Sequence, residues 1–258
     1  MTFIPTLTAV ALMACACSVK EDRGDCPCWL KVIIDPFPGS GAVISAWEDR
    51  QVLQDLVEQD PGDSYEATVP RGIASVTCFR NTRGMDYRNG TVLIAMGNEA
   101  DSLYAHHATV DCTGEEATDR VTLNKQFATV YMTFAADEGD DTPFPYDITV
   151  RGHVDGMDMS TLEPHAGDFE MSPARTGARL WQFRLPRQKD ASLTIDLYRK
   201  EDGQKADTLP MGQYIEESGF DWNAESLEDI AVTVDFAKMG LEVRVTEWDA
   251  DTVYDVTI

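Results

Sequence analysis

The stretch YEATVPRGIASVTCF, residues 65–79, decides the fold class of this chain. Apolar or β-branched residues alternate with polar ones on both sides of the turn at residues 70–72, which is typical of strands. The proline of that turn fixes the backbone and its glycine accepts conformations that other residues avoid. The stretch is therefore predicted to form a hairpin of two strands, at 65–69 and 73–79.

Short runs of the same kind occur along most of the chain, separated by loops that contain proline, glycine or charged residues. Further strands are predicted in the first half at residues 29–34, 43–47, 52–57, 91–95, 104–110 and 120–123. The pattern starts again after Phe127, with strands predicted at 130–134, 146–151, 181–185, 193–198, 230–236, 241–248 and 253–258. The runs at 43–47 and 52–57 are consistent with a hairpin, although the second also fits one face of a helical turn. No helical period of ten or more residues occurs.

This arrangement predicts an all-β fold. Many short strands with turns between them are typical of a sandwich or a barrel. The chain of 258 residues is long enough for two separate cores, and the pattern restarts near residue 125. Two tandem domains are expected, an N-terminal one at 29–125 and a C-terminal one at 126–258. The last strand, at 253–258, is expected to close the edge of the second domain, with donation to a neighbouring subunit as the alternative.

The first residues predict an export signal. An apolar run ends in Ala14-Cys15-Ala16-Cys17, and it is far shorter than the ~20 residues of a membrane-spanning helix. A small residue before a cysteine is typical of a bacterial lipoprotein signal, here residues 1–16. The spacing alone slightly favours Cys15 over Cys17 as the lipid attachment site, and an ordinary cleaved signal is the alternative. Residues 17–28 are charged and suit a tether.

The charge of the chain argues against nucleic acid as a partner. Lys and Arg total 21 and Asp and Glu total 45, which gives a net charge of −24. Such a surface repels phosphate backbones and anionic lipid head groups. Hydrophobic residues make up 43% of the chain and aromatic residues 9%, spread in short runs, so a folded body is expected despite the charge.

Four cysteines follow the predicted signal. Cys26 and Cys28 are separated only by Pro27, which makes a bond between them difficult. Cys78 and Cys112 belong to the same predicted domain and could form a disulfide in an exported protein. Four cysteines allow three connectivities, and the sequence leaves them open. Because no C-x-x-C pair is present, a zinc site is not expected.

No catalytic or metal-binding motif stands out. The chain lacks G-x-S-x-G, H-E-x-x-H, a Walker loop and G-x-G-x-x-G. His106 and His107 are adjacent in a predicted strand, where neighbours point to opposite faces. The acidic loop at 137–141 lacks the spacing of an EF-hand, so a solvated turn is expected, with calcium as the alternative. No enzyme activity, catalytic residue, metal or cofactor is predicted.

Two stretches resemble the FimB-type fimbrial anchor lipoproteins of Bacteroidales. The first runs from Cys17 through Lys20-Glu21-Asp22 to Cys26-Pro27-Cys28, like the lipid cysteine, short tether and first strand of that family. The second is LPMGQYIEESGFDW at 209–222, which continues through 227–236 to 243–248. Between them, the turn at 70–72 and the crossing at 123–128 are similar in layout, so the resemblance covers most of the mature chain.

The resemblance implies two tandem transthyretin-like β-sandwich domains and a lipid on Cys17, with Cys15 as the alternative. It implies a surface lipoprotein that tethers a fimbria to the outer membrane and affects fibre length and adhesion. Glu21 and Asp22 resemble the signal that sends such lipoproteins to the cell surface. The expected partners are fimbrial stalk subunits, bound through strand-mediated contact.

Two other functions remain as alternatives. The first is a surface lipoprotein that binds a glycan or host ligand through aromatic loops, with four tryptophans available for such loops: Trp47, Trp181, Trp222 and Trp248. Aromatic residues at strand ends more often pack in a core. The second alternative, an envelope hydrolase, is the weakest because it has no motif to support it.

Overall fold

The structure is a computed structural model, and the residues that it describes are 26–36, 42–48, 51–59, 64–80, 85–88, 90–135, 144–235, 240–247 and 250–254. The predicted signal peptide at 1–16, the tether before Cys26, the acidic loop at 137–141 and residues 255–258 lie outside them.

Within these residues the chain forms strands and one short helix, α1 (Met211–Glu217). The strands of the first half are β1 (Cys28–Ile34), β2 (Ala42–Glu48), β3 (Gln51–Gln59), β4 (Ser64–Val69), β5 (Ile73–Arg80), β6 (Met85–Arg88), β7 (Thr91–Ile94), β8 (Tyr104–Asp111), β9 (Glu116–Val121) and β10 (Asn124–Lys125). Those of the second half are β11 (Phe127–Phe134), β12 (Tyr146–Asp158), β13 (Glu163–Met171), β14 (Leu180–Pro186), β15 (Thr194–Arg199), β16 (Lys205–Leu209), β17 (Asp229–Asp235), β18 (Gly240–Glu247) and β19 (Ala250–Tyr254). In the described part of the chain no helix is long and apolar enough to cross a membrane.

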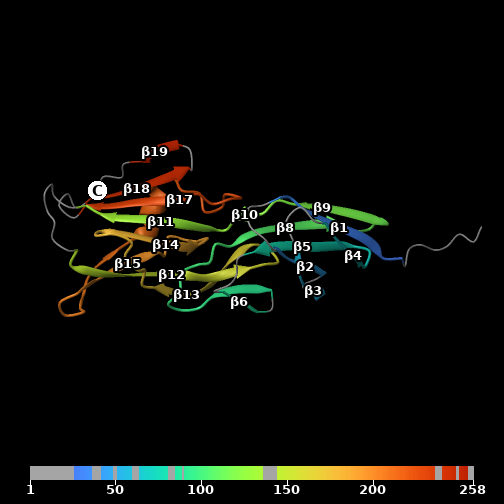
Figure 1. The fold of residues 1–258 in the computed structure, drawn as a ribbon, viewed down its shortest axis with the longest axis horizontal. Helices are drawn as coiled ribbons and strands as arrows, with labels where there is room; N and C mark the ends of the chain where they lie inside the picture. Colours follow the sequence, from blue (N-terminus) through green and yellow to red (C-terminus); the bar gives the residue numbers. More distant parts are fainter. Residues whose placement is uncertain are drawn as a thin grey trace, which may run out of the picture.

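The all-β prediction is confirmed, and the first half is a β-sandwich. One sheet has the order β4-β1-β9 and the other the order β10-β8-β5-β2-β3 (Figure 1). In β1 every second side chain is buried, as the period of two predicts. Side chains from both sheets form one core, which includes Leu30 and Val32 of β1 and Val76 of β5.

The predicted hairpin at residues 65–79 is wrong, although both of its strands exist. β4 pairs with β1, whereas β5 pairs with β2 and β8 in the other sheet. The turn at 70–72 therefore carries the chain from one sheet to the other. A hairpin and a crossing between sheets both consist of two alternating runs joined by a tight turn, so the local sequence pattern cannot distinguish them. The second predicted hairpin is confirmed, because β2 pairs antiparallel with β3 and the 52–57 run is a strand.

The second half contains a larger core between two sheets. The first has the order β14-β11-β17-β18-β19, and the second the order β16-β15-β12-β7-β6, with β13 also paired to β12. The core between them includes Trp181, Phe183 and Ile195. Helix α1 buries Met211 and Ile215, one turn apart, against it. Neither α1 nor the exposed strand β16 was predicted.

One sheet contains strands from both halves of the chain. Residues 146–151 of β12 pair with β15, while residues 156–158 pair with β7 of the first half. A third, smaller core at this place joins Phe79, Val92 and Leu103 to Met157 and Met159. The predicted ranges 29–125 and 126–258 therefore share a sheet and a core.

The end of the described chain forms the edge of its own sheet. Strand β19 pairs antiparallel with β18, from Glu247↔Ala250 to Val243↔Tyr254. The expected short hairpin after 241–248 is thus present, with its second strand three residues earlier than predicted.

Candidate functional site

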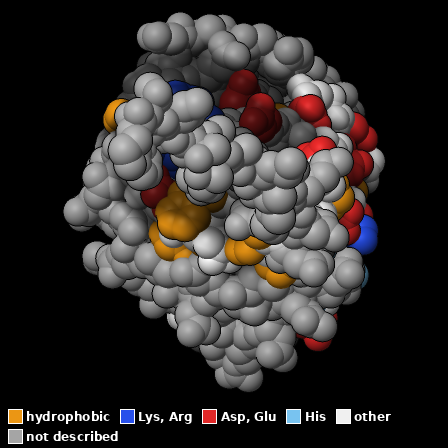
Figure 2. Space-filling view, turned by 90° about the vertical axis from the view of Figure 1, so that its right-hand side faces the viewer, with side chains coloured by type: hydrophobic (Ala, Val, Ile, Leu, Met, Phe, Trp, Pro, Cys, Tyr) orange, Lys and Arg blue, Asp and Glu red, His pale blue; other side chains and the backbone are white. Residues whose placement is uncertain are grey.

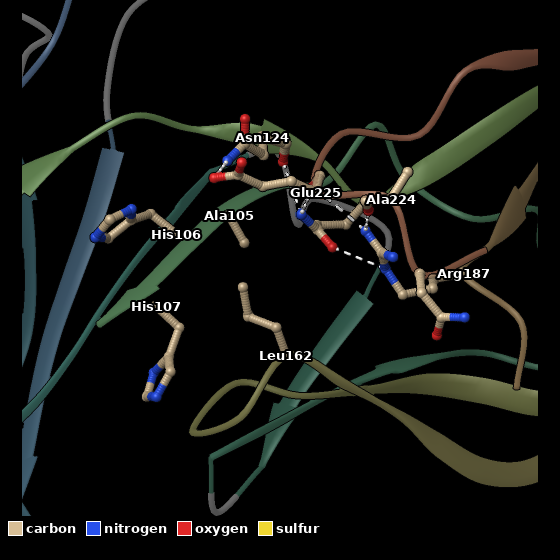
Figure 3. Close-up of a pocket in the computed structure, with 10 residues that line it drawn as sticks. Ala105, His106, His107, Asn124, Leu162, Arg187, Ala224 and Glu225 are labelled. Carbon is tan, nitrogen blue, oxygen red and sulfur yellow. Dashed lines mark hydrogen bonds between the residues drawn. The ribbon is translucent and has the colours of Figure 1, made fainter. Parts of the chain in front are cut away.

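A cavity of about 260 Å³ lies where the two halves of the chain meet. Its walls come from β8, from the crossing between the halves, from the loop after β12 and from two loops of the second half (Figure 3). The lining residues are Ala105, His106, His107, Asn124, Gln126, Leu162, Arg187, Asn223, Ala224 and Glu225.

Local structure explains how these walls are positioned. The two-residue strand β10 pairs with β8 through Asn124↔Ala105 and Lys125↔Tyr104, which fixes the crossing beside the histidines. Leu162 ends a tight turn in which its amide donates to the carbonyl of Asp158 over 2.8 Å. Its φ of 57° is a left-handed conformation that is uncommon for leucine.

Arg187 is the centre of a cluster that ties the second half to the crossing. The side chain is only 8% exposed, and its Nε donates to Oε1 of Gln126 over 3.0 Å. Its Nη1 donates to the carbonyl of Trp222, and its Nη2 donates to that of Ala224 over 2.8 Å. Burial lowers the pKa of Arg187, yet a guanidinium stays charged in proteins. The buried charge is therefore solvated by neutral oxygen atoms, and we call Gln126, Arg187 and residues 222–225 the Arg187 cluster.

The crossing is held to β17 by a second set of polar contacts. The ammonium group of Lys125 forms a mostly buried ion pair with Asp229 at the start of β17. The same carboxylate accepts a hydrogen bond from the amide of Thr129 over 2.8 Å. The amide of Leu227 donates to the carbonyl of Lys125 over 2.9 Å. These bonds fix the crossing along both sides.

The two histidines have separate partners, as the opposite faces of a strand require. Nε2 of His106 lies 3.3 Å from a carboxylate oxygen of Asp119 on β9. Nδ1 of His107 lies 3.0 Å from the hydroxyl of Thr77, and that hydroxyl donates to the carbonyl of Met159 over 2.6 Å. Because the hydroxyl has a single hydrogen, Nδ1 of His107 carries its own proton and donates. Burial lowers the pKa of His107, and the neighbouring His106 lowers it further.

The chemistry available to this cavity is limited. Each charged side chain and each histidine of its described walls already has a hydrogen-bond partner, such as Asn124 for Glu225 and Gln126 for Arg187. The described lining residues include no serine, threonine or cysteine nucleophile. In the part of the chain that the structure describes, no group of three or more His, Cys, Asp or Glu side chains could hold a metal. The arrangement is suited to joining the two halves.

A larger, open hollow of about 500 Å³ lies on the second half, across β12, β13 and β15. Its walls include Arg151 and His153. Arg151 bonds to Asp196 over 3.0 Å and to Glu170. Met96, at 69% exposure, lies at its border. The side chains of Arg151 and His153 can hydrogen-bond a polar ligand, but the described lining residues include no tryptophan or tyrosine.

The predicted disulfide between Cys78 and Cys112 does not fit the strand register. Both are buried and free. Cys78 lies opposite His106, whereas the amide of Cys112 donates to the carbonyl of Gly72. Gly72, beside Cys112, and Cys78 are six residues apart along an extended chain, which corresponds to about 20 Å. Bonded cysteines have Cα atoms within about 7 Å of each other. Cys112 instead contacts Cys28, a pairing that the sequence left open.

The other predicted site residues are only partly described. Cys15, Cys17 and the acidic loop at 137–141 lie outside the described residues, as do the side chains of Trp47 and Trp248. Trp181 and Trp222 are buried in the core of the second half, at 2% and 7% exposure, and belong to no binding loop. Among the three tryptophans whose side chains are described, the exposed one is Trp29 on β1, at 50%, which the sequence interpretation did not consider as a binding residue. Alternation along β1 could have identified it as outward-facing.

Figure 2 views the end of the molecule at which the first half lies. Hydrophobic side chains are visible in the middle of this end, and acidic side chains follow one border of it.

Comparison with solved structures finds the same overall fold in proteins of Porphyromonas and Bacteroides. The fimbrial anchor protein Mfa2 from Porphyromonas gingivalis superposes over 89% of this chain and 100% of its own, with 11% identity and a TM-score of 0.59. A candidate polysaccharide-binding protein from Bacteroides thetaiotaomicron superposes over 89% and 98%, with 13% identity and a TM-score of 0.64. A candidate adhesin from Bacteroides ovatus superposes over 89% and 96%, with 12% identity and a TM-score of 0.58.

The resemblance seen in the sequence is therefore confirmed at the level of the fold. No family model matches the sequence, and no curated protein sequence matches it.

Proposed function

We propose that this protein is a fimbrial anchor or assembly subunit at the cell surface and not an enzyme. The observation that carries the proposal is the end-to-end likeness to the anchor protein Mfa2, over 89% of this chain and 100% of the other. At that coverage the match extends into both halves of the chain. Holding a fibre needs binding surfaces and no catalytic group.

The proposal includes attachment to the outer membrane through a lipid on Cys17, with Cys15 as the alternative. Several acyl chains, at about 0.8 kcal/mol per buried methylene, give stable attachment. The two sandwiches are taken to be the tandem transthyretin-like domains that the resemblance implies. The described chain begins with Cys26 next to β1, at the end of the molecule opposite β15 and β18 (Figure 1). The second half then lies away from the membrane.

Within this proposal, stalk subunits bind an open sheet edge of the second half. β16 pairs with β15 on one side and is the outer strand of its sheet. Four of its five side chains, residues 205–208, are exposed. An open edge offers backbone donors and acceptors to an incoming strand. β19 is also an edge strand. Because it already pairs with β18 in its own sheet, we do not propose that it is donated to a neighbouring subunit.

Anchoring is tested in cells that carry Cys17→Ala in place of the native chain. The expected result is loss of fibres from the cell surface and their appearance in the medium, with no acylated Cys17 peptide by mass spectrometry. Cys15→Ala is the matched control and should retain surface fibres. The double variant tests whether Cys15 takes over. Fibres retained normally by the double variant would contradict lipid anchoring.

Contact with the stalk is tested by a photo-crosslinking residue placed at Ala206 of β16, which is exposed. We expect a crosslink to the stalk subunit in purified fibres. The same residue placed at Glu116 of β9, an exposed position on an edge of the first half, is the control and should give none. The reverse pattern would place the contact on the first half.

A glycan-binding surface protein is the second candidate function. It is favoured by the open hollow around Arg151 and by the likeness to a candidate polysaccharide-binding protein at a TM-score of 0.64. A glycan array read with the wild type and with His153→Ala tests it. Saturable binding that the variant loses would favour this function over anchoring.

A further inference from the structure

We propose that Cys28 and Cys112 form a disulfide that joins the two sheets of the first sandwich next to the place where the tether enters. Cys28 is the first residue of β1 in the sheet β4-β1-β9. Cys112 directly follows β8 of the opposite sheet. The other contacts described between these two sheets are non-covalent, so the disulfide would add a covalent link.

The backbone brings the two cysteines to the same turn. Cys28 lies opposite Val69, the last residue before the turn at 70–72. The amide of Cys112 donates to the carbonyl of Gly72, the last residue of that turn, over 2.8 Å. Both cysteines thus flank the short segment that passes from one sheet to the other.

Arg71 in the same turn fixes the chain on either side of the pair. Its Nε donates to the carbonyl of Cys26 over 2.7 Å, and its Nη1 donates to that of Thr113 over 3.0 Å. The amide of Trp29 donates to the carbonyl of Glu115 over 2.8 Å. The neighbours of both cysteines are therefore hydrogen-bonded into one arrangement.

The thiols themselves are in contact and shielded from water. Both side chains are 0% exposed and belong to the core of the first sandwich. The Cys112 thiol is within hydrogen-bonding reach of the Cys28 thiol. Burial, with a contribution from Cys28, raises the pKa of Cys112 to about 11. The thiolate, which is the reactive form, is therefore scarce once the protein has folded.

Oxidation then belongs to the folding stage, before the core closes. One cysteine thiolate attacks a disulfide-bearing oxidant such as oxidised glutathione and releases one glutathione. The second cysteine attacks the resulting mixed disulfide and releases the other. The two cysteine thiols lose two electrons and two protons in total, and the oxidant becomes two thiols. Only the supply of such an oxidant in the cell rests on the proposed export of the protein.

The test is refolding of the full chain, carrying Cys15→Ser and Cys17→Ser to remove competing thiols, with reduced and oxidised glutathione. A non-reducing tryptic digest should join peptide 24–31, which contains Cys26 and Cys28, to peptide 89–120, which contains Cys112. Cys28→Ser should abolish this linked peptide, and Cys112→Ala should do the same. Cys26→Ser and the buried control Cys78→Ser should retain it.

Stability gives a second readout that does not depend on a variant folding. Protein refolded with dithiothreitol, which keeps the thiols reduced, should melt about 10 °C below protein refolded under oxidising conditions. The disulfide closes a long loop of the unfolded chain and so stabilises the oxidised form. A link to peptide 72–80, a link lost in Cys26→Ser but kept in Cys28→Ser, or four free thiols after refolding would each overturn the proposal.

Protein isolated from cells separates this inference from the proposed function. The linked peptide in both preparations supports both proposals. A link that forms on refolding but is missing in the cell-derived protein supports the bond and counts against the proposed surface location.

Discussion

Arg187 is a buried cation whose bonds end on neutral oxygen atoms. Replacing it with methionine keeps much of the volume but leaves Oε1 of Gln126 and the carbonyls of Trp222 and Ala224 without this donor. A buried acceptor without a partner costs about 1–3 kcal/mol. We expect Arg187→Met to lower the free energy of unfolding by about 3 kcal/mol in urea titrations.

Arg199→Met is the matched control for this prediction. Arg199, the last residue of β15, is exposed and pairs with Asp202 in the turn that follows, over 2.8 Å. Exposed ion pairs of this kind contribute about 0–1 kcal/mol. Equal losses in the two variants would show that the Arg187 cluster does not stabilise the junction.

His107 makes stability depend on pH. Burial places its folded pKa below the ordinary value of 6.5, so the unfolded chain binds the proton more readily. The contribution is complete above pH 6.5 and is lost as the pH falls through the folded pKa. We expect the urea midpoint to fall from pH 7.5 towards pH 5, and to fall less in His107→Asn, whose amide can still donate to Thr77.

A wild-type profile identical to that of His107→Asn would exclude His107 as the source of the pH dependence.

The sequence could not reveal these residue-scale contacts. The bonds from Arg187 to Gln126 and to Trp222 span 61 and 35 residues, and no local pattern connects them. The sequence left the cysteine pairing open for a related reason. The sequence placed Cys78 and Cys112 in one domain, but only the register of β5 against β8 shows how far apart they are. That His106 and His107 point to opposite faces was predicted from strand geometry, whereas their partners Asp119 and Thr77 were not.

At the scale of elements, one glycine controls the pairing that joins the halves. A Cβ atom on Gly156 of β12 would lie 2.2 Å from the carbonyl oxygen of Val92 on β7. The obstacle is backbone, so β7 would have to move away from β12. We expect Gly156→Ala to lower the free energy of unfolding by at least about 2 kcal/mol, measured by urea titration.

Gly114→Ala is the control for Gly156→Ala. The nearest atom to a Cβ at Gly114 is 3.5 Å away, which is an ordinary contact. It should change the free energy of unfolding by less than about 0.5 kcal/mol. Were Gly156→Ala equally mild, β7 would not be tightly paired to β12.

Strands were predictable where alternation is strong and less so elsewhere. β1 and β4 have regular buried positions and were found. β16 has an almost fully exposed sequence, and α1 is only seven residues long, so neither produces a clear period. Which strands pair with each other is harder still to predict, because a stretch such as 65–79 has the same pattern in a hairpin as in a crossing between sheets.

The whole molecule should unfold as one unit. The sheet β16-β15-β12-β7-β6 and the core around Met157 contain residues from both halves. Loss of either half exposes apolar surface of the other, which couples their stability. We expect a single calorimetric transition, with a calorimetric enthalpy equal to the van't Hoff enthalpy. Two separate transitions would show that the shared sheet does not couple the halves.

The placement of β1 has a mechanical consequence for the proposed anchoring role. The strands run roughly along the long axis of the molecule, and β1 begins near its end, between antiparallel β4 and parallel β9 (Figure 1). Tension applied at Cys28 along that axis loads the hydrogen bonds on both sides of β1 in shear, all at once. Peeling would break them one after another at a lower force. The fold therefore resists a steady pull best in the direction in which a tethered fibre would pull it.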